Sequence, residues 1–351
     1  MREVAIVSFA QARAKRRELD ANEVEILMPV VQEAVARSGI PKREIGFTVS
    51  GSCDYVAGQP FAFVSALDAV GAWPPISESH VEMDGAFALY EAWVKLQTGE
   101  IDSALIYSFG KTSMGDPAAV LNLQLDPYTV SPLGIDAVSL AALQARLLLD
   151  SGRYTEKDMA EVVARSRRSA KSNPNAQLRG DVDPAGLLAE PYYASPLRKH
   201  DCCPVSDGAA ALVIAGAELA RKVTNRPAWI RGIDHRIESH DLGLRDLTRS
   251  PSTTLAAERA GARSGRFDLA ELHAPFSHQE LILCEALGLA DDVKINPSGG
   301  ALAANALMVA GLTRIGEAAR RILDGEAKRA LAHATSGPCL QQNLVCVLEG
   351  N

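Results

Sequence analysis

Along this chain, short apolar runs alternate with segments in which hydrophobic residues recur at helical spacing. This pattern predicts alternating strands and helices. Short apolar runs between turn residues predict buried strands, and apolar stripes at intervals of three and four residues predict helices. Strands are expected at 4–9, 45–50, 104–108 and 207–215, and helices at 22–38, 60–70 and 85–98. Asn22 is expected to cap the first helix and Gly39 to end it. This alternation predicts an α/β fold with a mainly parallel sheet covered on both faces.

The same pattern begins again at residue 228, so an internal duplication of the fold is expected. In this second part, strands are expected at 228–234, 269–273, 330–334 and 344–348, and helices at 252–262, 279–287 and 301–323. Residues 111–204 interrupt the first part with helices at 136–149 and 156–172 and with proline-containing loops. We therefore expect an N-terminal half over 1–227, which includes an inserted cap at 111–204, and a C-terminal half over 228–351.

Composition narrows the classes of function. The chain has 351 residues, 47% of them hydrophobic, and a formal net charge of -7 without a long basic run. Nucleic acid is therefore not an expected partner. The short basic segment 13–17 is expected to be a solvated loop, with phosphate binding as the alternative. No apolar run approaches the roughly 20 residues that span a bilayer, and no signal peptide is recognised at the start, so a cytoplasmic protein is expected.

The cysteines do not form a recognisable metal motif. Six are scattered along the chain, and none belongs to a CxxC pair, so neither a zinc ribbon nor a bound metal is expected. Cys202 and Cys203 are adjacent, which makes them poor joint ligands, and we expect them to pack before the strand at 207–215.

Two segments carry the residues best suited to catalysis. Residues 273–277 read His-Ala-Pro-Phe-Ser at the end of an apolar strand, and residues 296–300 read Asn-Pro-Ser-Gly-Gly. A histidine beside a glycine-rich turn with free N–H donors suits chemistry on a carbonyl or a thioester. His273 is therefore the expected acid or base, with helix capping as the alternative. His278, one turn later, is expected on the helix surface.

These segments resemble the thiolase superfamily, and in particular the thiolase-like proteins of the sterol carrier and lipid-transfer type. The resemblance covers nearly the whole chain and rests on the segments 201–211, 271–277, 285–289 and 296–300. It implies two duplicated βαβαβαββ halves in a layered α-β-α-β-α body that forms a dimer or a larger oligomer. It also implies chemistry that makes or breaks a carbon–carbon bond next to a coenzyme A thioester.

The resemblance places the family's catalytic positions only in part. His273 falls on the position of the activating histidine. The position of the nucleophilic cysteine falls within 81–86, where there is no cysteine and Asp84 stands instead, either as a helix N-cap or as a catalytic carboxylate. The family's Gly-His-Pro turn falls near Asn305, whose amide is a candidate for holding an oxyanion. The late proton-transferring cysteine corresponds to Cys339, for which a buried, inert thiol is the alternative.

The glycine-rich turn and the cap supply candidates for ligand contact. Ser298, Gly299 and Gly300 are expected to shape the floor of the site and to offer backbone N–H groups, with a tight turn that binds nothing as the alternative. Tyr128, Tyr192 and Tyr193 of the cap are further candidates for contact with the ligand.

Three functions remain open on the sequence. The favoured one is a retro-aldol cleavage of a 3-hydroxyacyl-CoA of lipid metabolism, such as a steroid side chain, because this reaction needs no acyl-enzyme. Coenzyme A would then enter as the substrate thioester, and the resemblance implies a small partner protein with an OB-fold and a zinc ribbon. The second is a non-catalytic thiolase-fold subunit that binds acyl-CoA or scaffolds a partner. The third is a conventional acetyl-CoA acetyltransferase that uses Cys53 or Cys339.

Overall fold

One large mixed sheet organises the molecule. The structure is a computed structural model that describes residues 1–351. Ten strands follow one another across the sheet in the order β10-β9-β11-β12-β8-β1-β7-β4-β2-β3. They are β1 (Val4–Gln11), β2 (Phe47–Gly51), β3 (Glu78–Val81), β4 (Ser103–Gly110), β7 (Gly208–Gly216), β8 (Ala228–Ile237), β9 (Leu269–Leu272), β10 (Lys294–Ile295), β11 (Arg329–Ser336) and β12 (Gln342–Glu349).

The two halves of this sheet have the same topology. The first half has the strand order β3-β2-β4-β7-β1 and the second has β10-β9-β11-β12-β8, so each strand has a counterpart in the other half. Antiparallel pairing of β1 with β8 joins them. The main helices of the first half are α1 (Glu23–Ser38), α3 (Ala62–Val70) and α4 (Gly85–Thr98), and those of the second are α10 (Pro251–Arg259), α11 (Ser277–Leu287) and α12 (Ala310–Leu323). This repetition supports our proposal that 1–227 and 228–351 are duplicated halves.

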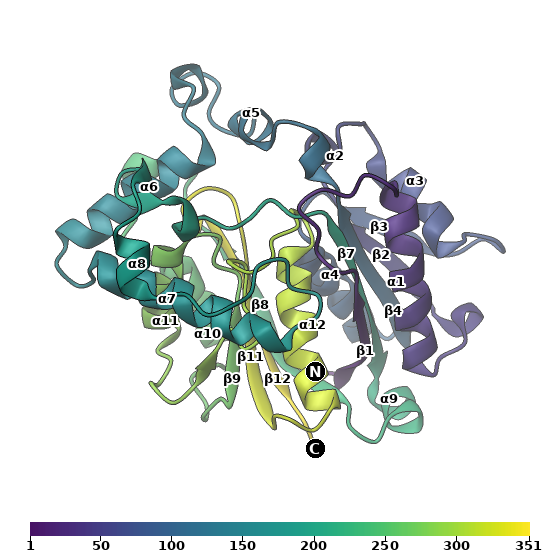
Figure 1. Cartoon of the computed structure of the whole chain (residues 1–351). Helices are drawn as coiled ribbons and strands as arrows, with labels where there is room; N and C mark the ends of the chain where they lie inside the picture. The colour runs from purple at the N-terminus through teal and green to yellow at the C-terminus, as the bar shows by residue number, and fades with distance from the viewer.

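Helices fill the space between the two halves and cover both outer faces. One hydrophobic cluster joins α4 and α12 to the inner faces of both halves, a second lies under α1 and α3, and a third lies under α10 and α11. Figure 1 shows α12 between the strands of the two halves. Close packing there requires glycine at position 316, because a Cβ atom would lie 2.1 Å from the ring of Phe9 on β1.

The predicted α/β fold is confirmed, but the expectation of a mainly parallel sheet is wrong. Four adjacent strand pairs are parallel, whereas five are antiparallel. The reason is the last strand of each half, since β7 and β12 each run antiparallel to both of their neighbours. The short strands β3 and β10 were not predicted, because neither has an apolar run of its own.

The predicted helix at 22–38 is confirmed, and so are its capping residues. The helix expected at 301–323 begins only at residue 310. The side chain of Asn22 accepts a hydrogen bond from the N–H of Glu25, and Gly39 ends α1 in the left-handed conformation. Residues 301–309 form turns because their backbone groups bond outside the segment. The carbonyl of Ala303 accepts from Leu178, and that of Met308 accepts from Gly85.

Residues 111–204, for which we expect a cap, form helices and one short hairpin. They include α5 (Pro117–Asn122), α6 (Ala137–Asp150), α7 (Glu156–Ser169), α8 (Pro184–Leu188) and the hairpin β5 (Tyr192–Ala194) and β6 (Leu197–Arg198). The remaining short helices are α2 (Asp54–Ala57) and α9 (Ala217–Val223). None of the helices has the length and apolar character needed to cross a membrane.

Candidate active site

A cavity of about 200 Å³ lies where the ends of β9 and β11 meet the cap and the start of α4. It brings together four residues that are far apart in the sequence and were singled out there, namely Asp84, His273, Asn305 and Cys339. The rest of the lining is mainly apolar and comes from α5 and α6, from the loop after β11, and from the segments just before α11 and α12. These apolar residues are Leu121, Leu125, Ala137, Leu140, Ala141, Pro275, Phe276, Leu307, Met308, Pro338 and Leu340.

His273 follows the last residue of β9 and is buried in the cavity wall as a neutral imidazole. Its Nε2 lies 3.1 Å from Oδ1 of Asn305, and its Nδ1 accepts a longer hydrogen bond of 3.4 Å from the N–H of Thr335. Because Asn305 Oδ1 can only accept, Nε2 carries the proton, and the lone pair of Nδ1 is the one that accepts from Thr335. Burial lowers the pKa of His273 to about 3, with smaller contributions from His333 and Arg314.

Asn305 links this histidine to a thiol that the sequence did not indicate as a site residue. The Nδ2 of Asn305 donates to Sγ of Cys203 at 3.2 Å, and its backbone N–H donates to Oγ of Ser206. Cys203 lines the same cavity and is partly exposed. Burial raises the pKa of the Cys203 thiol to about 12, so this side chain holds its proton at neutral pH. The contact could not be foreseen, because it joins residues about a hundred positions apart.

Asp84 occupies the N-termini of both central helices. Its carboxylate accepts from the N–H of Ala86 on α4 and from the N–H groups of Gly311 and Leu312 on α12, at 2.8 to 2.9 Å. Burial raises the pKa of Asp84 to about 6 against the opposing effect of these three donors. Because both oxygens are already bound by backbone groups, the geometry favours a cap that ties the two halves together.

The loop after β11 offers backbone donors to the cavity. Cys339 and Leu340 are buried and have positive φ angles of 54° and 58°, and Gly337 has a φ of 74°. The N–H groups of these three residues make no hydrogen bond within the protein. The thiol of Cys339 donates to the carbonyl of Leu140 at 3.5 Å, and burial raises its pKa to about 11. The Cys339 thiol is therefore protonated and already bonded, whereas these backbone N–H groups have no partner in the protein.

The turn formed by Ser298, Gly299 and Gly300 does not line this cavity. The backbone N–H and hydroxyl of Ser298 both donate to the carboxylate of Glu271, which also pairs with Arg314 at 3.0 Å. Gly299 is closely packed, since a Cβ there would lie 2.7 Å from Cβ atoms of Ala170 and Ala303. The contacts of this turn are those of a packed connection, and its predicted role in ligand binding remains a prediction.

An open cationic cleft adjoins the cavity at Cys203, which lines both. Its charged lining includes Arg16, Arg17, Arg167 and Lys199, none of which forms an ion pair with a carboxylate. It also includes Glu190, which lies 3.1 Å from His200. Unpaired cations gathered in one cleft are notable in a chain whose net charge is -7. They make the cleft a suitable place for phosphate groups.

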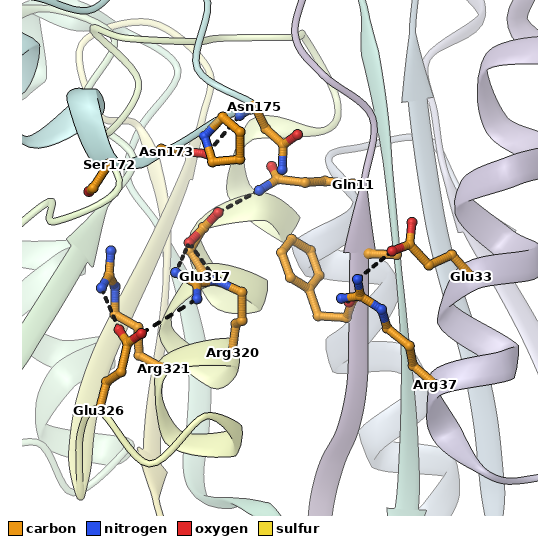
Figure 2. A pocket seen from close by; sticks show the side chains of 13 residues that line it. Gln11, Glu33, Arg37, Ser172, Asn173, Asn175, Glu317, Arg320, Arg321 and Glu326 are labelled. Carbon is orange, nitrogen blue, oxygen red and sulfur yellow. Dashed lines mark hydrogen bonds and ion pairs between the residues drawn. The ribbon is translucent and has the colours of Figure 1, made fainter.

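A second polar hollow, between β1, α1 and the end of α12, is less suited to ligand binding. Figure 2 shows that its charged side chains pair with one another. Gln11 and Arg320 both bond to Glu317, and Arg321 pairs with Glu326 at 2.8 Å. Because these charges are already neutralised within the protein, the hollow resembles a structural junction between the two halves.

Other residues considered from the sequence lie around these sites. His278 is wholly buried instead of lying on the helix surface, because α11 packs against α6, where Nε2 of His278 contacts Gln144 at 3.1 Å. Tyr193 lines the cationic cleft, whereas Tyr128 is largely exposed and Tyr192 bonds to Glu156. No three His, Cys, Asp or Glu side chains are grouped as metal ligands.

The chain matches no protein-family model, but it is similar to individual proteins over most of its length. Acetyl-CoA acetyltransferase of Methanothermobacter thermautotrophicus is 28% identical over 370 residues, which cover 96% of this chain and 95% of that protein. Sterol carrier protein 2 of Bos taurus is 25% identical over 86% of this chain and 64% of its own length.

Solved structures share the fold. The Ltp2-ChsH2(DUF35) aldolase has a TM-score of 0.84 at 20% identity, covering 99% of this chain and 97% of the matched chain. Acetyl-CoA acetyltransferase of Bacillus anthracis has a TM-score of 0.80 at 17% identity, covering 100% of this chain and 99% of that one. The chain therefore has the thiolase fold, and in sequence it is similar to proteins that are named acetyl-CoA acetyltransferase and sterol carrier protein 2.

Proposed function

We propose that this protein cleaves a carbon–carbon bond of a 3-hydroxyacyl-CoA by a retro-aldol reaction. The observation that carries the proposal is the placement of His273 beside Asn305 and Cys203 in a mainly apolar cavity that adjoins a cationic cleft. Similarity to proteins that are named for acetyl-CoA and for sterol carriage supports an acyl-CoA of lipid metabolism, such as a steroid side chain, as the substrate. The likeness in fold to an aldolase supports the reaction type.

The two hollows would bind different parts of the thioester. The phosphates of coenzyme A suit the cleft lined by Arg16, Arg17, Arg167 and Lys199. Phosphate binding is the alternative that the sequence left open for the segment 13–17. The apolar lining from α5 and α6 suits a lipid acyl group. Cys203, which lines both hollows, marks the boundary where the thioester would lie.

In the proposed reaction, Nδ1 of His273 takes the proton of the 3-hydroxyl group and gives up its long hydrogen bond from the N–H of Thr335. The C2–C3 bond breaks as the C3 carbonyl forms, and its electron pair moves into the enolate of the thioester. The free N–H groups of Gly337, Cys339 and Leu340 would stabilise the enolate oxygen in the low-dielectric cavity. An aldehyde or ketone leaves, and no acyl-enzyme is needed.

Cys203 is our candidate for the acid that protonates C2 of the enolate. Its thiol is protonated at neutral pH, it lines the cavity, and Asn305 Nδ2 is placed to stabilise the thiolate that remains. One proton then passes from the imidazolium of His273 to the thiolate of Cys203 through solvent in the adjoining cleft, which restores both side chains. One thioester gives one carbonyl product and one shortened acyl-CoA, so the reaction needs no co-reactant.

The same cysteine favours a second candidate, a conventional thiolase reaction that depends on free coenzyme A. In that reaction Cys203, in place of Cys53 or Cys339, would carry the acyl group, because it lines both the cavity and the cationic cleft. The raised pKa of the thiol argues against it, because the thiolate is the nucleophile.

Assembly is a separate part of the proposal. β3 lies at one edge of the sheet, and Tyr55, Phe61 and Trp73 nearby are exposed. We infer that a second copy covers this edge, and that a small OB-fold and zinc-ribbon protein, which the resemblance implies, is a further partner. The double name of the Ltp2-ChsH2(DUF35) aldolase supports a partner. Light scattering on the purified protein tests the first part, since a monomer at micromolar concentration would contradict it.

Product analysis tests the function. The protein is incubated with short-chain and steroid 3-hydroxyacyl-CoA and 3-ketoacyl-CoA esters, with and without free coenzyme A, and the products are identified by mass spectrometry. Cleavage of a 3-hydroxyacyl-CoA without free coenzyme A is expected. Cleavage only of 3-ketoacyl-CoA, and only with free coenzyme A, would support the thiolase reaction instead. Binding without turnover would support a non-catalytic subunit.

A further inference from the structure

A buried amide in the wall of the cavity has an oxygen without a partner. Gln279, in the first turn of α11, lines the cavity and is only 3% exposed. Its Nε2 donates to Oε1 of Gln144 on α6 at 3.0 Å, but its own Oε1 has no hydrogen-bond partner in the protein. A buried acceptor without a donor is costly, and such groups in a ligand cavity point to a partner on the ligand.

The orientation of this amide is fixed by its neighbours. Nε2 of Gln144 donates to the backbone carbonyls of Leu247 and Cys339, at 3.0 and 3.4 Å, so its Oε1 must face the other way. That oxygen faces Nε2 of Gln279 and Nε2 of His278. Turning the Gln279 amide over would place two oxygens in contact. Gln279 therefore keeps an unpaired acceptor in the wall of the cavity, and the network fixes the orientation of its amide.

The position of Gln279 associates it with the acyl part of a ligand. Its contacts are with α6, whose residues Leu140 and Ala141 belong to the apolar lining. The cationic cleft instead adjoins the cavity at Cys203, and Gln279 does not line that cleft. A donor that reaches Gln279 is thus expected on the acyl group instead of on the nucleotide end of coenzyme A.

We propose that Gln279 is a specificity-determining residue that accepts a hydrogen bond from a hydroxyl on the acyl group, beyond the hydroxyl that reacts. The inference rests on the proposed function, since it assumes an acyl-CoA ligand, and it adds the class of acyl group. A hydroxylated chain satisfies the acceptor, whereas a hydrocarbon chain leaves it buried and unpaired. The cavity would therefore select hydroxylated acyl groups.

Binding measurements on the intact protein test this inference without requiring turnover. The dissociation constants of octanoyl-CoA and of octanoyl-CoA esters with one hydroxyl at C4, C5, C6, C7 or C8 are compared by calorimetry. We expect at least one hydroxylated ester to bind the wild-type protein about tenfold more tightly than octanoyl-CoA. Gln279→Met, which keeps the length of the side chain and removes the acceptor, is expected to abolish that preference.

The matched control is Gln124→Met, at another glutamine of the cavity lining whose side chain is exposed, and it is expected to keep the preference. Gln279→Asn, which withdraws the amide, serves as a second variant with the same expectation as Gln279→Met. The inference is overturned if the wild-type protein binds all the esters equally, or if the preference survives in both Gln279 variants. If no ester binds at all, the proposed function fails and the inference fails with it.

Discussion

At the scale of single residues, Asp84 shows how one side chain can serve two helices. The sequence indicated an N-cap of α4, which is what the carboxylate provides through Ala86. The hydrogen bonds to Gly311 and Leu312 could not be predicted from the sequence, because α12 begins more than two hundred residues after Asp84. A local cap is thereby also a connection between the two halves.

Asp84→Ala is expected to destabilise the protein by about 3 kcal/mol, because three buried N–H groups lose their acceptor. Urea unfolding measures the change. Asp136 is the matched control, since it caps α6 through a single exposed bond to Ser139, and Asp136→Ala should cost about 1 kcal/mol. Equal losses in the two variants would show that the bonds to α12 add nothing.

Residues of the site were predictable where the signal is local and not where it is tertiary. His273 stood out because it follows an apolar strand, and the structure places it in a cavity with Asp84, Asn305 and Cys339. Their chemical roles remain predictions. Cys203 was expected only to pack, because nothing near it in the sequence indicates its contact with Asn305.

At the scale of elements, periodicity predicted most helices and strands because each buries one face against the sheet. It failed at 301–309, where an apolar run suggested helix but tertiary hydrogen bonds hold turns. It also missed β3 and β10, which are short edge strands. The basic segment 13–17 was expected to be a loop, and the structure has it exposed beside the cationic cleft.

The double variant Arg16→Ala, Arg17→Ala is expected to weaken coenzyme A binding about tenfold at low salt, because both guanidinium groups line the cleft without a carboxylate partner. The loss should shrink as ionic strength rises, since salt screens such interactions. Calorimetric titration measures both effects. Arg13→Ala changes an exposed arginine of the same segment that does not line the cleft, and should leave binding unchanged. A similar loss in this control would refute the assignment of phosphates to the cleft.

At the scale of the whole molecule, the free energy of unfolding depends on pH through three buried, neutral histidines, His273, His278 and His333. Burial lowers the pKa of His273 and His278 to about 3 and that of His333 to about 4, from an ordinary value of 6.5. The unfolded chain therefore binds more protons below pH 6.5. Stability is fully present above that pH and is lost as the pH falls toward 4. Asp84, whose pKa is raised to about 6, acts in the opposite direction between pH 6 and 4.

Each of the three histidines is expected to remove about 2 kcal/mol of stability between pH 7 and pH 5. Urea unfolding at both pH values measures the total. In His278→Gln, whose amide can still donate to Gln144, the loss should be smaller by about 2 kcal/mol. His240→Gln, at an exposed histidine, should show the wild-type loss. If His278→Gln has the same pH dependence as the wild-type protein, the neutral state of His278 is not what couples stability to pH.

The most direct test of the central claim is cleavage of a 3-hydroxyacyl-CoA in D₂O without free coenzyme A, followed by mass spectrometry of the released acyl-CoA. We predict that the wild-type protein forms an aldehyde or ketone and a shortened acyl-CoA with one deuterium at C2. With His273→Asn, both products should be absent or should form at least a hundredfold more slowly. Formation of the shortened acyl-CoA only when free coenzyme A is supplied, or at an unchanged rate with His273→Asn, would contradict the central claim.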